Sequence, residues 1–253
     1  MKDKNGCRFA PYTFAWAVHI FTASAVFVGL LSLVKIYQHQ YVLALWLMAL
    51  TVVIDSVDGS LARLVRVKEV LPKIDGTLLD NMVDYLNYVV TPSFFLLVKP
   101  DMLPSDYALW LIFALTLASA YQFCQDDAKT PDHFFKGFPC YWNFAVFYMF
   151  IFDTSMTTNA WIIGILCFLI FVPIKYVYPS RLDYLTQSTT LKILMHTCSI
   201  IYGISSVLLL WNYPQSNPIL LSISLGYVAM YLMLSIYRTY SPMIIAKMTI
   251  GKH

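Results

Sequence analysis

The chain has few charged residues for its length. Asp, Glu, Lys and Arg together make up 12% of its 253 residues, whereas 59% are hydrophobic. Soluble domains carry about 25% charged residues, so this composition excludes an ordinary soluble protein and a disordered one. A formal net charge of +3 is also too small to build a phosphate-binding face, which excludes a nucleic-acid-binding protein. The composition is typical of an integral membrane protein.

Cysteine is also scarce, and it forms no pattern. The five cysteines contain no Cys-x-x-Cys pair; they are Cys7, Cys124, Cys140, Cys167 and Cys198. We therefore expect neither a disulfide framework nor a zinc site.

Long apolar runs dominate the rest of the sequence. A hydrocarbon core of about 30 Å requires about 20 apolar residues per helix, and eight runs approach this length. They cover residues 14–35, 40–61, 77–98, 104–123, 138–153, 159–177, 191–211 and 218–237, and the fifth is the shortest. With no internal repeat and no linker, we predict one all-α membrane domain over residues 1–253. It would be a bundle of about eight transmembrane helices.

The basic residues indicate the orientation of these helices. Of 17 Lys and Arg residues, 15 fall in the two termini and in alternate connections, and Lys35 and Lys99 lie on the other side. Because cytoplasmic loops retain Lys and Arg, this asymmetry predicts cytoplasmic termini and an even number of spans.

Four aspartates lie at the predicted cytoplasmic ends of two apolar runs. Asp55 and Asp58 are three residues apart in the second run, and Asp80 and Asp84 are four apart in the third. This spacing puts each pair on one helix face. Aspartate inside a bilayer is costly and usually faces a polar cavity, so we predict a cavity that opens to the cytoplasm.

Four converging carboxylates would repel one another unless cations lay between them. Oxygen ligands without a neighbouring His or Cys favour Mg²⁺ or Mn²⁺, and two such ions can clamp a phosphoryl group. Beside the aspartates, Gly59 lets a ligand approach the backbone, Ala62 keeps the same strip shallow, and Arg63 offers donors suited to phosphate. Gly76 has the same function one turn before Asp80. A strip of small residues is also common where helices pack together.

At these positions the sequence resembles the CDP-alcohol phosphatidyltransferase family. The family pattern is two aspartates, a glycine, an Ala-Arg pair, a spacer, a glycine and two further aspartates. The matching residues are Asp55, Asp58, Gly59, Ala62, Arg63, Gly76, Asp80 and Asp84. The spacer of 12 residues, 64–75, is longer than in most members and resembles that of the bacterial phosphatidylcholine synthase branch. Segments 132–143 and 172–181 are also similar to that branch.

The resemblance implies a reaction and a role for each matching residue. CDP-diacylglycerol and choline would give phosphatidylcholine and CMP at the inner membrane of a bacterium. Asp55, Asp58 and Asp80 would bind metal, and Asp84 would bind metal and act as the general base. Gly59, Ala62 and Arg63 would line the nucleotide groove. A homodimer is expected from the resemblance alone.

Other candidates come from residue type and position. Choline is held by aromatic faces, which makes Tyr141, Trp142 and Tyr178 candidates, although interfacial aromatic residues are common in membrane proteins. Thr22, one turn after His19, could line the nucleotide pocket or bond another helix. Lys136 and Arg181 lie where a lipid phosphate would bind, and positive-inside anchoring explains them almost as well.

Two alternative functions stay open. A related phosphatidyltransferase would use serine, inositol or glycerol phosphate as acceptor. A cation transporter also needs intramembrane carboxylates, but its site usually lies near the bilayer midplane, between repeated halves.

Overall fold

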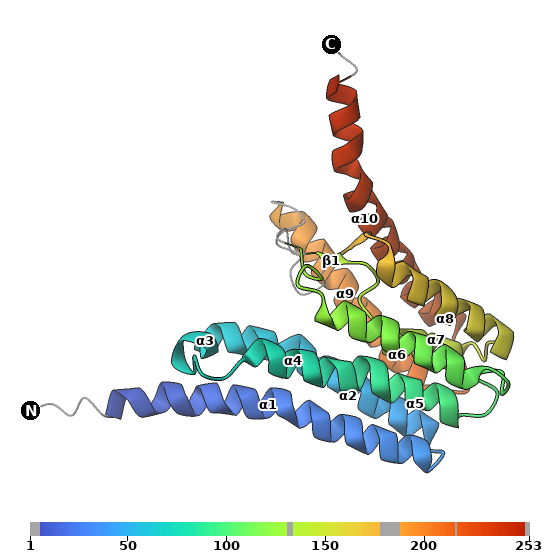
Figure 1. Cartoon of the computed structure of the whole chain (residues 1–253), viewed down its shortest axis with the longest axis horizontal. Coiled ribbons are helices and arrows are strands. Elements are labelled where there is room, and N and C mark those ends of the chain that lie inside the picture. The colour runs from blue at the N-terminus through green and yellow to red at the C-terminus, as the bar shows by residue number, and fades with distance from the viewer. Residues whose placement is uncertain (1–5, 131–133, 178–187, 216, 251–253) are drawn as a thin grey trace, which may run out of the picture. The chain divides into compact units, whose positions relative to one another are not determined.

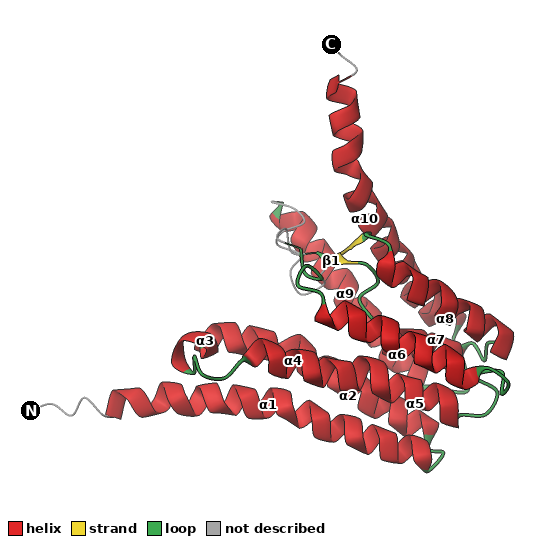
Figure 2. Ribbon diagram, viewed as in Figure 1, coloured by secondary structure: helices red, strands yellow, loops and turns green. Residues whose placement is uncertain are grey.

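A computed structural model describes residues 6–130, 134–177, 188–215 and 217–250. These residues are almost entirely helical, which confirms the all-α prediction (Figure 2). The helices are α1 (Gly6–Tyr37), α2 (Tyr41–Val65), α3 (Val67–Val70), α4 (Gly76–Asp84), the π-helix η1 (Tyr85–Val90), α5 (Thr91–Val98), α6 (Ala108–Cys124), α7 (Trp142–Ile151), α8 (Met156–Phe171), α9 (Thr189–Trp211) and α10 (Pro218–Ile250). Two short strands are β1 (Phe135–Lys136) and β2 (Lys175–Tyr176).

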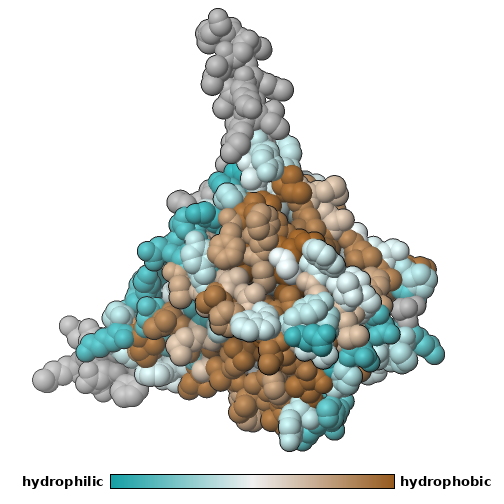
Figure 3. All heavy atoms as spheres, turned by 45° about the vertical axis from the view of Figure 1, so that its right-hand side comes forward, coloured by the Kyte–Doolittle hydropathy of each residue, from teal (hydrophilic) through white to brown (hydrophobic). Residues whose placement is uncertain are grey.

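Each predicted apolar run contains a helix, and the third contains the continuous series α4, η1 and α5. Four helices are long and apolar enough to cross a membrane, namely Pro11–Tyr37, Tyr41–Val65, Thr189–Trp211 and Pro218–Tyr240. Shorter apolar helices are α6, α7 and α8. Much of the face drawn in Figure 3 is hydrophobic, as expected of a surface in contact with lipid. The chain is a multi-pass membrane protein.

The predicted fifth and sixth runs extend beyond their helices. Only Trp142–Ile151 of residues 138–153 is helical, a length of about 15 Å at 1.5 Å per residue. Gly137 has φ +79° and Pro139 follows it, so an α-helix cannot extend through this segment. Lys136 instead pairs with Lys175 in an antiparallel ladder between β1 and β2. The sequence analysis predicted neither strand.

Contacts divide the chain into two compact units. The first comprises Met1–Thr116, Tyr141–Phe147 and Ser155–Thr157, and the second comprises Leu117–Cys140, Tyr148–Thr154 and Thr158–His253. The single domain over residues 1–253 therefore stays a prediction.

In the first unit, α1 runs beside α2 and beside the series α4, η1 and α5 (Figure 1). Ala25, Ile54 and Val83 form a buried apolar cluster between these three segments. The connection after α2 has a defined conformation at both ends. Arg66 adopts φ 54° and caps α2, and the Asp75 side chain accepts hydrogen bonds from two backbone amides at the start of α4. This turn brings the end of α2 back beside α4.

In the second unit, α9 and α10 lie side by side (Figure 1). The Tyr148 and Ser224 hydroxyls are 2.6 Å apart, and the rings of Tyr202 and Tyr227 stack with centroids 4.5 Å apart. Hydrogen bonds between helices are a usual means of association where lipid supplies no hydrophobic driving force.

Candidate active site

Three of the predicted carboxylates meet in the first unit. One oxygen from each of Asp55, Asp80 and Asp84 lies within 4.8 Å of the other two, and all three residues are half-buried. Asp80 and Asp84 share a face of α4, and α2 brings Asp55 to that face. Carboxylate oxygens this close, without a nitrogen or sulfur ligand among them, fit a hard divalent cation such as Mg²⁺ or Mn²⁺.

Asp58 lies beside this group with partners of its own. It is 6% exposed and accepts a hydrogen bond from the Thr22 side chain of α1 and another from the Gly59 backbone. The sequence analysis placed Asp58 with the metal and Thr22 with the nucleotide, and the structure brings the two residues into contact. Thr22 thus holds a carboxylate of the predicted metal-binding motif.

Arg63 folds back over the small-residue strip of α2. Its guanidinium donates to the Ser60 hydroxyl at 3.0 Å, and a Cβ added at Gly59 would lie 3.5 Å from the same guanidinium. The Arg63 side chain is exposed. Ala62 packs instead against the apolar cluster that contains Ala15 and Val67, so its small size serves helix packing in this structure.

Gly76 faces a histidine that the sequence analysis named only in passing. A Cβ at Gly76 would lie 3.2 Å from Cε1 of His19, which is tighter than most such contacts. His19 is 7% exposed, and its Nε2 has no hydrogen-bond partner among the described residues. Gly76 therefore makes room for an imidazole, and the sequence gave no sign of this pairing.

A tyrosine that the sequence analysis missed belongs to the carboxylate group. The Tyr88 hydroxyl donates to Oδ2 of Asp55 at 2.7 Å, and its ring lies 6.3 Å from that of Tyr141. The signal was present in the spacing, because Tyr88 follows Asp84 by four residues and so stays on the same helix face. Through this contact Tyr141, a predicted choline residue, comes close to the acidic site.

The other aromatic and basic candidates are placed differently. Trp142 is fully buried at 0% exposure, whereas Tyr141 is half-buried. Tyr178 and Arg181 lie outside the described residues.

Lys136 lines a cavity of about 340 Å³ in the second unit. Tyr121, Gln125 and Phe171 also line it, and the rings of Tyr121 and Phe171 stack at 5.1 Å. The lysine is held in place locally, since Gln122 donates to its backbone carbonyl at 2.8 Å. The cavity has the cation and the apolar walls that a lipid head group with its first methylenes would need.

Lys136 also forms an ion pair with Asp127, at 2.5 Å between Nζ and Oδ2. The hydrogen bond with Lys136 lowers the pKa of Asp127, and the hydrogen bond with Asp127 raises the pKa of Lys136. Both groups are therefore charged at neutral pH.

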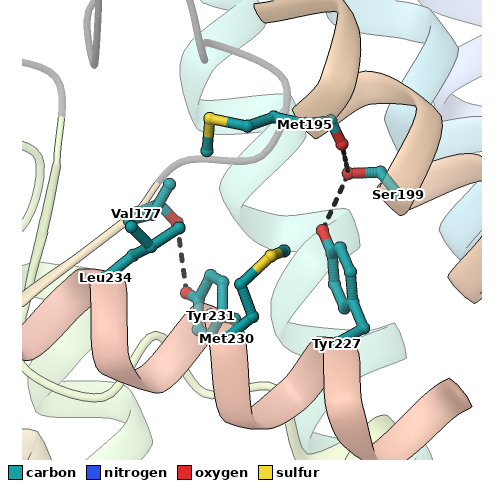
Figure 4. A pocket seen from close by; sticks show the side chains of 7 residues that line it. All are labelled: Val177, Met195, Ser199, Tyr227, Met230, Tyr231 and Leu234. Carbon is teal, nitrogen blue, oxygen red and sulfur yellow. Dashed lines mark hydrogen bonds between the residues drawn. The ribbon is translucent and has the colours of Figure 1, made fainter. Parts of the chain in front are cut away.

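A second cavity, between α9, α10 and the residue after β2, is too small for a substrate (Figure 4). Its volume is about 10 Å³, roughly that of one water molecule. Tyr231 donates to the Val177 carbonyl at 3.1 Å, and the Ser199 and Tyr227 hydroxyls are 2.8 Å apart. This is a packing site whose polar groups bond one another.

The sequence model of CDP-alcohol phosphatidyltransferases matches residues 15–174. The chain belongs to this family. Phosphatidylcholine synthase of Legionella pneumophila is 70% identical over 238 residues, covering 94% of this chain and 93% of that protein. The phosphatidylcholine synthases of Borreliella burgdorferi and Pseudomonas aeruginosa are 39% and 32% identical, each over 89% of this chain and more than nine-tenths of their own length. The family expected from the eight motif residues is confirmed, and with it an enzyme.

Proposed function

We propose that this protein transfers the phosphatidyl group of CDP-diacylglycerol to choline, giving phosphatidylcholine and CMP. The observation that carries the proposal is the convergence of Asp55, Asp80 and Asp84 in the first unit. The names of relatives that cover nearly the whole chain support choline as the acceptor. The membrane setting agrees, because the donor is a lipid and its reacting phosphate lies at the surface of the bilayer.

We propose that Asp55, Asp80 and Asp84, joined by Asp58, hold two divalent ions, Mn²⁺ or Mg²⁺. When bound, such ions neutralise the pyrophosphate and the charge that develops on departing CMP. Asp58 is suited to join them because its hydrogen bonds from Thr22 and Gly59 keep it ionised inside the protein.

Asp84 is the proposed general base. A choline hydroxyl is a poor nucleophile at neutral pH, so a carboxylate must accept its proton as the oxygen attacks. The new bond joins the choline oxygen to the phosphorus next to diacylglycerol. The bond from that phosphorus to the bridging oxygen breaks, its electron pair leaves with CMP, and the proton resides on Asp84.

The nucleotide would lie along the exposed side of α2 at Gly59 and Arg63, with Ala62 and Gly76 shaping the groove and Thr22 at its base. Arg63 can turn from Ser60 toward a phosphate because its side chain is exposed. The choline ammonium would bind against Tyr141, which lies beside Tyr88, with Trp142 and Tyr178 as further candidates. Lys136 and Arg181 would bind the lipid phosphate.

Localisation and assembly are also proposals. The distribution of Lys and Arg supports cytoplasmic termini and a cytoplasmic active site in the inner membrane of a bacterium. A homodimer is proposed from the family alone.

The test is CMP release by the purified protein with CDP-diacylglycerol and Mn²⁺, assayed separately with choline, serine, inositol and glycerol phosphate. We expect turnover with choline and a product that migrates as phosphatidylcholine. Turnover with another alcohol but not with choline would favour a sister enzyme. Cation flux into proteoliposomes without CMP release would indicate a transporter and contradict the proposal.

A further inference from the structure

The hydroxyl of Tyr88 points at the acidic site from a helical turn of unusual geometry. Directly after Asp84 the chain changes from an α-helix to the π-helix η1, which carries Tyr88 and ends where α5 begins. Inside the folded chain Tyr88 is 6% exposed, and its hydroxyl donates to Oδ2 of Asp55 at 2.7 Å. Single π turns in α-helices are frequent at functional sites.

A residue in the sequence accounts for the π turn. Pro92 has no N–H, and its ring would clash with the carbonyl of Tyr88 in a regular α-helix. The chain avoids the clash by widening the preceding turn. The Thr91 amide and hydroxyl both donate to the Leu86 carbonyl, five residues earlier, and the hydroxyl does so at 3.0 Å.

Two further contacts hold this turn in place. Asn87 donates from Nδ2 to the Ala25 carbonyl of α1 at 3.2 Å, and Gly29 of α1 leaves room for its Oδ1. The Tyr85 hydroxyl donates to the Thr116 carbonyl of α6 at 3.0 Å. Tyr88 therefore extends from a turn that is fixed to its neighbours, and a site held on a fixed element keeps its geometry.

We propose that Tyr88 is a positioning residue that fixes the Asp55 carboxylate for metal binding. This inference rests on the proposed function, since it takes the three aspartates as metal ligands. A neutral phenol can orient a carboxylate without neutralising it, and a carboxylate has lone pairs enough to accept this bond and bind an ion. The other two ligands come from the same helix series as Tyr88, so the bond also sets the distance of α2 from them.

The test is the affinity of the purified protein for Mn²⁺, measured by electron paramagnetic resonance of the free ion. The variant Tyr88→Phe keeps the ring and removes the hydroxyl. We expect its Mn²⁺ affinity to fall by about 10- to 100-fold, the usual cost of losing a partner of a metal ligand. The matched control is Tyr41→Phe at the far end of α2, which removes a hydroxyl that donates to the Val98 carbonyl. It should bind Mn²⁺ as the wild type does.

A double-mutant cycle separates positioning from general support of the fold. If Tyr88 acts through Asp55, the Tyr88→Phe substitution should change Mn²⁺ affinity by less than about twofold in an Asp55→Asn protein. Equal effects in the two backgrounds, or wild-type affinity in Tyr88→Phe, would overturn the proposal. A Tyr88→Phe protein that loses its helical circular dichroism would overturn it as well, because the hydroxyl would then serve folding. Mn²⁺ binding does not depend on choline as acceptor, so failure of the proposed function would be visible separately, as absent phosphatidylcholine synthesis by the wild type.

Discussion

Gly59→Ala separates a ligand groove from a packing strip on α2. The glycine lies within the helix, and an added Cβ would make ordinary contact at 3.5 Å with the end of Arg63 and with no other described side chain. Alanine in a helix is favoured over glycine by about 0.5–1 kcal/mol, so the variant should be slightly more stable than the wild type.

The same methyl group should weaken nucleotide binding. If the nucleotide lies against the backbone at Gly59, the methyl overfills that contact at a cost of about 1–3 kcal/mol. At 1.4 kcal/mol per tenfold, the affinity for CDP should fall by about 5- to 150-fold. Thermal unfolding in detergent and calorimetric titration with CDP in the presence of Mn²⁺ measure the two effects.

The matched control is Gly164→Ala in α8, where an added Cβ would meet no atom within 4 Å. It should show the gain in helix stability without a change in CDP affinity. A Gly59→Ala protein with wild-type CDP affinity would refute the groove. A Gly59→Ala protein that is less stable than the wild type would show that the strip packs against another element.

Four further outcomes are expected. Asp84→Asn should lower the rate of CMP release by about 10²- to 10⁴-fold, with CDP affinity changed much less, because the base acts on choline; equal losses in both would contradict that role. Removal of divalent ions with a chelator should stop turnover, and Mn²⁺ or Mg²⁺ should restore it; turnover that survives chelation would exclude the metal site. Tyr141→Leu should raise the KM for choline by about 2- to 30-fold, the range of cation–π energies, with the KM for CDP-diacylglycerol unchanged. Lys136→Gln should weaken binding of CDP-diacylglycerol vesicles equally between about pH 6 and pH 9, because the Asp127 charge is lost only as pH falls through its lowered pKa and the Lys136 charge only as pH rises through its raised pKa. A binding inflection within that range would contradict the ion pair.

The positions of the acidic residues were predictable because they depend on helix periodicity. Residues three or four apart share a face, so the meeting of Asp80 and Asp84 followed from the sequence, and apolar surroundings indicated that Asp55 would join them. Asp58 was harder to place, since its Thr22 partner comes from another helix and the pairing depends on tertiary contact.

The irregular parts of the fold could not be predicted in the same way. The strand pair at Lys136 depends on Gly137, whose Cβ would overlap the Ile170 carbonyl, a contact between residues distant in sequence. The π turn that carries Tyr88 also escaped prediction. Its cause, Pro92, was visible in the sequence, but a proline inside an apolar run equally predicts a kink.

The contact between Gly76 and His19 links two positions in different helices. An imidazole on α1 and a residue without a side chain on α4 fill one space together, and a Cβ added at Gly76 would come within 3.2 Å of the ring. Each residue therefore limits what the other can be. In related sequences, a side chain at the position of Gly76 should appear with a smaller residue at the position of His19. Such paired exchange would record this contact in sequence variation, which neither position could reveal alone.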